Sequence, residues 1–308
     1  MPAHPPLAPQ VRSGPLVWAA SVVLLSVASI AAAQLGPEEM SPVSQTTVPT
    51  SPMLRAVREE ARRYLLDSKA IFTSPFRWDS GQWAQAGVFV AALAILGRRD
   101  SAIDAAIQRN RSSRSDAVSS AVTPFGSYAA VGASFAALGG GWLLRDSRLR
   151  DTGRDAIEAE LLAAGIVTPL LKTATGRLRP SQGSDSDEFH TLSGNQSFPS
   201  GHATEAFAVA SVFAARSEGW VVPTLSYALA SVVGLARVHD RAHFASDVFA
   251  GAVIGAAIGR SVVHRHVTSP ERASWELVPF EAHRGAGLAI RIGTGAAPPE
   301  ALSHAPGS

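Results

Sequence analysis

The feature that most constrains the fold of this chain is a series of apolar segments rich in alanine and glycine. They lie at about residues 84–97, 117–144, 156–171, 203–215, 219–235 and 244–263. No convincing run of alternating β-branched residues separates them, and such alternation is the pattern of a sheet with one buried face. The sequence therefore predicts an all-α protein, a bundle of helices.

Such a bundle can be soluble or can span a membrane. A spanning helix needs about 20 predominantly apolar residues. The segments at 84–97 and 203–215 are short, whereas those at 117–144 and 219–235 would pass as spans. We favour a soluble bundle, and a membrane-spanning bundle is the alternative.

The first 33 residues have the pattern of a targeting segment. Arg12 precedes an unbroken apolar run, Leu16–Ala33, which ends in three alanines. A basic start, an apolar core and a small-x-small site are typical of a signal peptide. We interpret residues 1–33 as a signal peptide, with an N-terminal anchor as the alternative. Both predict an exported protein on the periplasmic or extracytoplasmic side of the cell envelope.

The rest of the chain divides into three parts. Residues 34–52 are rich in Pro, Ser and Thr and predict a flexible linker. Residues 53–270 contain the apolar segments and predict one helical domain, beginning with an amphipathic helix at 53–72. In residues 271–308, alternating apolar residues on both sides of Gly285 predict a short β-hairpin, followed by a disordered tail.

Composition excludes several classes of function. There are 27 Lys and Arg against 25 Asp and Glu, a net charge of +2, which is too small to indicate a nucleic-acid partner. The absence of cysteine excludes disulfides and thiolate chemistry. Only Lys69 and Lys172 are lysines, so a lysine at a chemically suggestive position carries more weight.

The stretch from Arg237 to Asp247 holds a possible catalytic histidine. His243 and Asp247 are four residues apart at the entry to an apolar segment, so a helix there would place both on one face. A carboxylate in that position orients an imidazole and fixes its tautomer. Arg237 can bring a guanidinium to the same ring, where its fork of donors suits an oxyanion. A salt-bridged start of a helix is the alternative.

Two further stretches lie upstream. Lys172 and Arg179 are two helical turns apart, so both cations project from one face while the helix lasts, and Pro180 ends it. Arg177 is rotated off that face and fits an ordinary dipole partner better.

The second upstream stretch is Phe198-Pro-Ser-Gly-His202, directly before a helix. Ser200 and Gly201 offer a hydroxyl and free backbone N–H groups to an anion, and Ser200 also suits a plain N-cap. His202, in the first turn, feels the positive end of the helix, which favours proton exchange near neutral pH. Together the three stretches predict a site that holds a phosphate-like oxyanion while one imidazole attacks and the other moves a proton.

The combined pattern Lys-x6-Arg-Pro, Pro-Ser-Gly-His and Arg-x5-His-x3-Asp resembles the signature of the type 2 phosphatidic acid phosphatase and vanadium haloperoxidase superfamily. The resemblance covers about residues 80–265 and implies a helical bundle, a covalent phosphohistidine and, in the phosphatases, no metal or other cofactor. It also implies a role for each matching residue: His243 is the nucleophile, Asp247 its orienting partner and His202 the acid. The phosphate-binding residues would be Lys172, Arg179, Ser200, Gly201 and Arg237. One departure is Ala236, where the family often has serine.

The resemblance implies metal-independent hydrolysis of phosphate monoesters or diphosphates. The substrate would be a lipid phosphate such as phosphatidic acid or an isoprenoid diphosphate, or else a soluble phosphomonoester, with a membrane surface nearby. A vanadate-dependent haloperoxidase is one alternative, because the same cradle binds vanadate. The other is a non-catalytic helical protein of the envelope that binds lipid or a partner.

Overall fold

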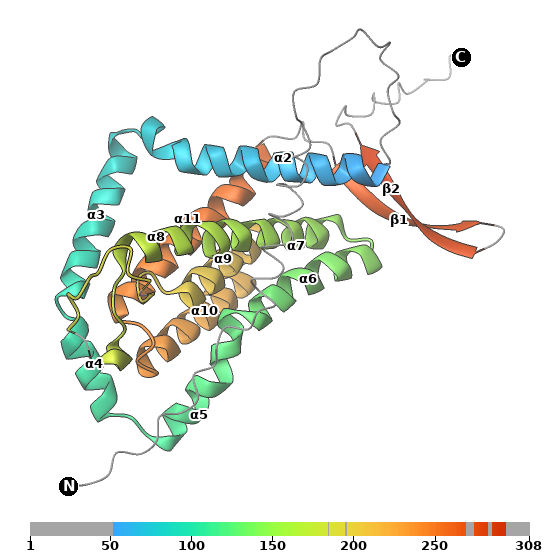
Figure 1. Ribbon diagram of the computed structural model, residues 1–308. Coiled ribbons are helices and arrows are strands. Elements are labelled where there is room, and N and C mark those ends of the chain that lie inside the picture. The colour runs from blue at the N-terminus through green and yellow to red at the C-terminus, as the bar shows by residue number, and fades with distance from the viewer. Residues whose placement is uncertain (1–51, 184, 195, 269–273, 283–284, 294–308) are drawn as a thin grey trace, which may run out of the picture. The chain divides into compact units, whose positions relative to one another are not determined.

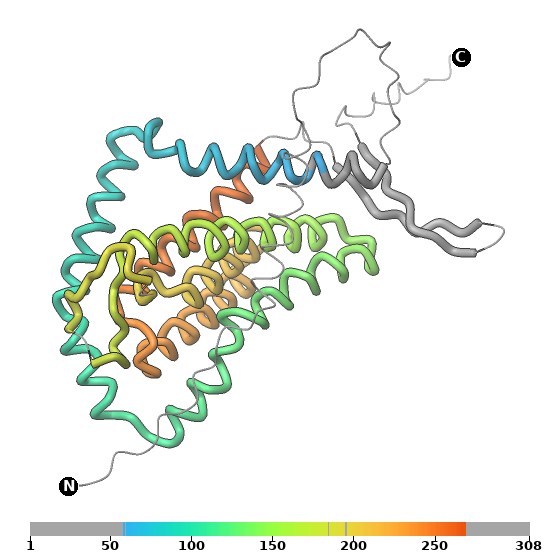
Figure 2. Tube along the Cα trace, in the orientation of Figure 1, coloured from blue at the N-terminus to red at the C-terminus, as the bar shows by residue number. Residues whose placement is uncertain are grey.

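The computed structural model describes residues 52–183, 185–194, 196–268, 274–282 and 285–293 (Figures 1 and 2). The predicted signal peptide, nearly all of the linker and the predicted disordered tail lie outside these residues. The helices are α2 Pro52–Thr73, η1 Ser74–Arg77, α3 Ser80–Gly97, α4 Asp100–Arg109, α5 Ser113–Val122, η2 Thr123–Gly126, α6 Tyr128–Leu143, α7 Ser147–Glu160, η3 Leu161–Val167, α8 Thr168–Thr175, η4 Pro180–Gln182, α9 Gly201–Arg216, α10 Val221–His239 and α11 Ala245–Thr268.

The helices confirm the predicted all-α class. The predicted amphipathic helix at 53–72 corresponds to α2, and a short helix that was not predicted, α4, follows α3. The predicted hairpin is also present, with β1 Ser274–Ala282 antiparallel to β2 Gly285–Gly293 and Leu277 opposite Ile290 (Figure 1).

The segment at 117–144, expected as one helix, is divided into α5, η2 and α6. Pro124 lies at the start of η2, where it cannot donate a helical hydrogen bond, and the pair formed by α5 with η2 and α6 is bent by 45°. Gly126 lies at the bend. A Cβ there would be 2.5 Å from Cγ1 of Val233 and 2.9 Å from Cβ of His202. The bend therefore brings backbone directly against His202 of the second motif, residues 198–202.

Small residues allow α9 and α11 to pack closely. Gly251, Gly255 and Gly259 recur once per turn of α11, and a Cβ at Gly255 would lie 2.1 Å from the carbonyl oxygen of Thr204 in α9. The adjoining core consists of Ala156, Ala159, Leu162, Ala163, Ala208, Val212, Ile258, Val262 and Val263. Since α9 begins within the second motif and α11 begins within the third motif, residues 237–247, this contact fixes the two motifs relative to each other.

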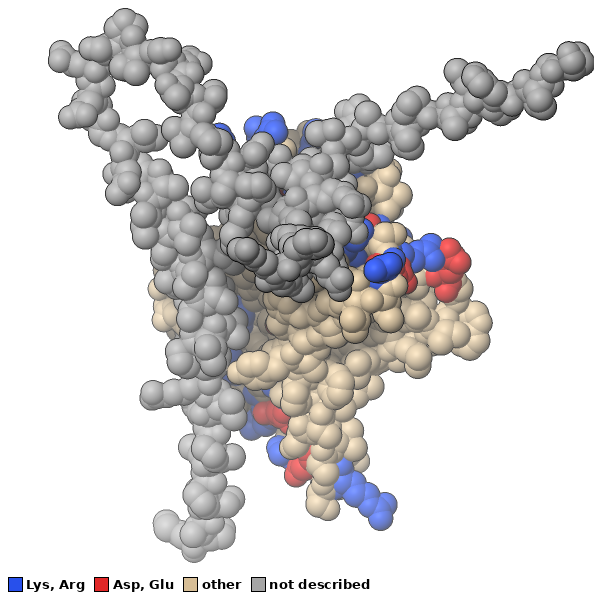
Figure 3. All heavy atoms as spheres, turned by 90° about the vertical axis from the view of Figure 1, so that its right-hand side faces the viewer, with Lys and Arg blue, Asp and Glu red and all other residues tan. Residues whose placement is uncertain are grey.

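Within the described residues, three helices are long and apolar enough to cross a membrane, namely α3, α10 and α11, and the bent pair of α5 with η2 and α6 is a fourth candidate. None of the residues in α3 is buried. Figure 3 shows a face on which a broad uncharged area separates groups of charged side chains. The length, composition and exposure of these helices indicate membrane association and weigh against the soluble bundle that we favoured. The segment expected at 84–97 was judged too short to span, but α3 begins four residues earlier, at Ser80, and is long enough.

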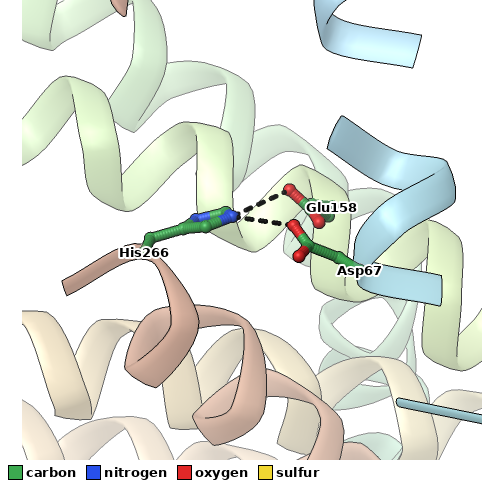
Figure 4. A group of neighbouring side chains, drawn as sticks. All are labelled: Asp67, Glu158 and His266. Atoms are coloured by element: carbon green, nitrogen blue, oxygen red, sulfur yellow. Dashed lines mark hydrogen bonds and ion pairs between the residues drawn. The ribbon is translucent and has the colours of Figure 1, made fainter. Parts of the chain in front are cut away.

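Buried charges attach α2 to the ends of α7 and α11. The imidazole of His266 lies between carboxylates: Nδ1 is 2.6 Å from Oδ1 of Asp155, and Nε2 is 3.1 Å from Oδ2 of Asp67 and 3.5 Å from Oε2 of Glu158 (Figure 4). Each carboxylate of the group has its own arginine partner, in the pairs Glu60–Arg154, Asp67–Arg265, Asp155–Arg216 and Glu158–Arg63. The carboxylates and arginines of the network therefore balance in charge, and they join four helices, α2, α7, α9 and α11.

Candidate active site

The first motif, residues 172–180, begins in α8 and continues as a loop beside the site. Gly176 adopts a left-handed conformation (φ 58°) that ends α8 after Thr175, and Arg179 is extended. Lys172 and Arg179 therefore do not share two turns of one helix as predicted, because the helix stops before the second of them. Lys172 donates through Nζ to the carbonyl of Gln196, just ahead of the second motif.

The second motif forms the start of α9. Ser200 is fully buried and is the N-cap residue, with its hydroxyl 3.5 Å from the amide of Ala203. Its own amide donates to the carbonyl of Asp247 at 3.0 Å. A Cβ at Gly201 would be 4.0 Å from Cε of Lys172, so the first two motifs are in contact.

The third motif spans the end of α10 and the start of α11. Arg237, in the last turn of α10, donates to Oγ1 of Thr123 at 2.5 Å and pairs with Asp240. His243 lies in the connecting loop, before the first residue of α11, whereas Asp247 is in its first turn. The two residues are therefore not on one helix face as expected.

The hydrogen bond that orients His243 comes from the backbone. Nδ1 of the buried ring is 2.7 Å from the carbonyl oxygen of Ser197 and 3.9 Å from Oδ2 of Asp247. A carbonyl can only accept, so Nδ1 carries the proton and Nε2 the lone pair. This corrects the expected direct bond from Asp247. The carboxylate is already occupied by the hydroxyl of Ser197 at 2.6 Å and the amide of Phe244 at 2.9 Å.

Positive charge converges on the two histidines. Burial lowers the pKa of His202 to about 4, and three cations add to the shift: Arg237, Lys172 and Arg179. Burial also lowers the pKa of His243, with contributions from Lys172 and Arg179. The pKa of Lys172 is lowered to about 8 by burial and by Arg179. The predicted site residues thus lie together, in a field that favours an anion.

Three residues that form ion pairs in the site were missed in the sequence analysis, namely Arg177, Asp100 and Asp240. Arg177, taken as a dipole partner, is buried and pairs with Asp247 and with Asp100 of α4. Asp240 pairs with Arg237 and accepts from the hydroxyl of Ser119 at 2.6 Å. The one signal in the sequence for Arg177 was Gly176, a residue that often ends a helix. If the helix ends there, Arg177 is not in the helix, and the argument that it points away from Lys172 and Arg179 no longer applies.

One group among the described side chains brings ligand atoms close enough for a metal ion: Asp67, Glu158 and His266. It lies near the C-terminal end of α11, about 30 Å along the helix from the third motif. Its carboxylates already face arginines. This group therefore belongs to the network that holds α2.

Comparison with known proteins identifies the family. The model of the PAP2 superfamily matches residues 159–270, which contain all three motifs. Residues 159–270 are thus similar to the PAP2 superfamily. The match does not cover α2 to α6, most of α7 or the hairpin.

Curated relatives of the PAP2 domain are named as lipid phosphatases. The lipid A 1-phosphatase of Porphyromonas gingivalis is 36% identical over 92 residues, 29% of this chain and 18% of that protein. The probable diacylglycerol pyrophosphate phosphatase 1 of Schizosaccharomyces pombe is 29% identical over 143 residues, 35% of this chain and 51% of that protein. The chain thus spans about half or less of the length of these relatives.

Among solved structures, a transmembrane PAP2 type phosphatidylglycerolphosphate phosphatase from Bacillus subtilis resembles the chain with a TM-score of 0.48 and 21% identity. The alignment covers 59% of this chain and 95% of that one. The crystal structure of Aquifex aeolicus LpxE gives a TM-score of 0.43 and 22% identity, covering 54% and 94%.

Proposed function

We propose that the protein is a phosphatase that hydrolyses lipid phosphates without a metal ion, through a phosphohistidine. The single observation that best supports this function is the convergence of two histidines and three cations, with Nδ1 of His243 bonded to the carbonyl of Ser197. That bond leaves the Nε2 lone pair for attack on phosphorus.

In the first step, Nε2 of His243 forms a bond to phosphorus as the bond to the ester oxygen breaks, and His202 gives its proton to the leaving oxygen. In the second step, His202 takes a proton from water as the water oxygen attacks phosphorus, and the P–N bond breaks. Lys172, Arg179 and Arg237 stabilise the equatorial oxygens, together with the hydroxyl of Ser200 and the backbone amide of Gly201.

The first step requires His202 to be protonated. Cations around the ring depress its pKa, and an anionic phosphate held among the same cations offsets their field and raises the pKa again. Substrate binding therefore favours the protonated form of His202, which the first step needs as its acid. In the empty site His202 is neutral at pH 7.

A lipid phosphate is the substrate class that we favour. The relatives are named for lipid A and diacylglycerol pyrophosphate, and three helices of this chain could lie in a membrane. The three motifs all meet at one end of α9, α10 and α11, which would place the site at a membrane surface. With the apolar run at 16–33, we assign that surface to the extracytoplasmic side of the envelope.

The test is a phosphate-release panel on the full chain in detergent, with phosphatidic acid, a polyprenyl diphosphate, lipid A and a soluble aryl phosphate. We expect the lipid phosphates to be preferred and EDTA to have no effect. His243→Ala should reduce kcat by at least about 10⁴-fold, because no other group takes its place as nucleophile.

Three results would contradict this proposal. If EDTA abolished activity and added metal ions restored it, the hydrolysis would depend on a metal. Halide oxidation that requires vanadate and peroxide would identify a haloperoxidase instead. Failure to hydrolyse any phosphate ester would favour a non-catalytic envelope protein.

A further inference from the structure

A buried guanidinium, that of Arg177, is bonded to Asp247, the carboxylate next to the proposed catalytic histidine. Nη1 of Arg177 donates to Oδ1 of Asp247 at 2.6 Å and to the hydroxyl of Ser246 at 2.7 Å, and Nη2 donates to Oδ2 of Asp100 at 2.8 Å. The ring of Phe244 lies 4.3 Å from its central carbon. Arg177 is 3% exposed, too little for it to meet a substrate, so it acts on other residues.

Asp100 fixes this guanidinium to two elements. It is the first residue of α4, and its Oδ1 accepts from the backbone amide of Ser246 at 2.9 Å. That amide is in the first turn of α11 and has no partner within the helix. Asp100 thus caps α11 from another helix while its Oδ2 holds Arg177.

The connection continues from Arg177 to the catalytic ring. Oδ2 of Asp247 accepts from the hydroxyl of Ser197, and the amide of Ser197 donates to the carbonyl of Arg177 at 3.0 Å. The carbonyl of Ser197 in turn accepts from Nδ1 of His243. Asp247 does not bond the ring, so its influence on ring orientation passes through Ser197.

We propose that Arg177, held by Asp100, is a positioning residue for the reaction. Together with Asp247 it fixes the position of the Ser197 carbonyl, and the bond from that carbonyl to Nδ1 orients the ring of His243 so that Nε2 faces phosphorus. This inference rests on the proposed function. A planar fork of donors at fixed angles suits the role, because two nitrogens of one group bond three side chains on α4 and α11. A lysine ammonium is one point charge and cannot reproduce that geometry.

The test compares Arg177→Met, Arg177→Lys and Asp100→Asn with a matched control, Arg216→Met. Arg216 also forms a half-buried guanidinium pair, with Asp155, but at the opposite end of α9, about 24 Å from Ser200. The control therefore loses a comparable ion pair without touching the site.

In the site variants we expect kcat to fall by about 10- to 100-fold, as when partners that orient a metal-bound histidine are removed, with KM changed less than about threefold. Arg177→Lys should recover part of the loss. Without the guanidinium, the uncompensated charge of Asp247 raises the pKa of His243, so the acid limb of kcat/KM should move up by about one pH unit. A site variant whose kcat and pH profile match those of Arg216→Met would overturn the inference.

A second measurement needs no turnover. The Nδ1–H of His243, buried and bonded to a carbonyl, should give a protected downfield proton resonance in ¹⁵N-labelled protein, assigned by its loss in His243→Ala. Arg177→Met should broaden or remove this signal and Arg216→Met should keep it. A wild-type protein inactive on the whole panel would refute the proposed function, whereas a signal unchanged in Arg177→Met would refute the positioning role.

Discussion

At the scale of single residues, the protonation states in the site depend on which charged groups are buried next to each other. Lys172 has its pKa lowered to about 8 by burial and by Arg179, so this cation is partly neutral just above neutral pH. Arginine keeps its charge at any accessible pH. The phosphate-binding group therefore contains one member that titrates in the working range.

This gives a prediction for the alkaline limb. kcat/KM, which reports groups of the free enzyme, should fall as pH rises through about 8, because Lys172 loses its proton and its attraction for phosphate. In Lys172→Arg the limb should move to higher pH, even if the maximum is lower. A steady-state pH profile measures this, and an unchanged limb in Lys172→Arg would assign it to another group.

At the scale of elements, the positions where helices stop matter more than where they run. Gly176 ends α8 and frees the first motif to fold back as a loop, and the Pro124 and Gly126 pair breaks a long apolar segment beside His202. Both breaks let backbone approach the site more closely than a continuous helix would allow.

Gly126→Ala tests the second break. The new methyl group would meet Val233 and His202 at less than 3 Å, so we expect a loss of about 1–3 kcal/mol in the free energy of unfolding and at least about a tenfold fall in kcat. Gly132→Ala is the matched control. It lies in α6 with open space around its Cβ position, and should be neutral or stabilising by about 0.5–1 kcal/mol. Denaturant titration and turnover on one lipid phosphate measure both; full activity in Gly126→Ala would show that the close contact is not required.

At the scale of the whole molecule, two groups of buried charge occupy opposite ends of α11. One surrounds His243 and Asp247, and the other joins α2 to α7 and α11 through His266 (Figure 4). The first serves the proposed chemistry. The second has a neutral balance of carboxylates and arginines and holds an amphipathic helix against the bundle.

The second group predicts a contrast in stability. Asp67→Asn removes the carboxylate that pairs with Arg265 and one of the three carboxylates around His266, which should cost about 3–5 kcal/mol. Glu218→Gln removes an exposed pair with Arg148 and should cost less than about 1 kcal/mol. Thermal unfolding in detergent compares the two, and turnover of the still-folded fraction should be unchanged in both. Equal stabilities would mean that α2 contributes little to the fold.

The sequence by itself determined the helical class, the hairpin and the set of candidate site residues, because periodicity and motif spacing are local properties of the chain. It could not determine how those residues are joined. The bond from Ser197 to His243, the burial of Arg177 and its link to Asp100 arise where α4, α8, α9 and α11 meet, between residues far apart in the chain. Only the tertiary structure decided these, since burial and the pairing of charges depend on which distant segments exclude water together.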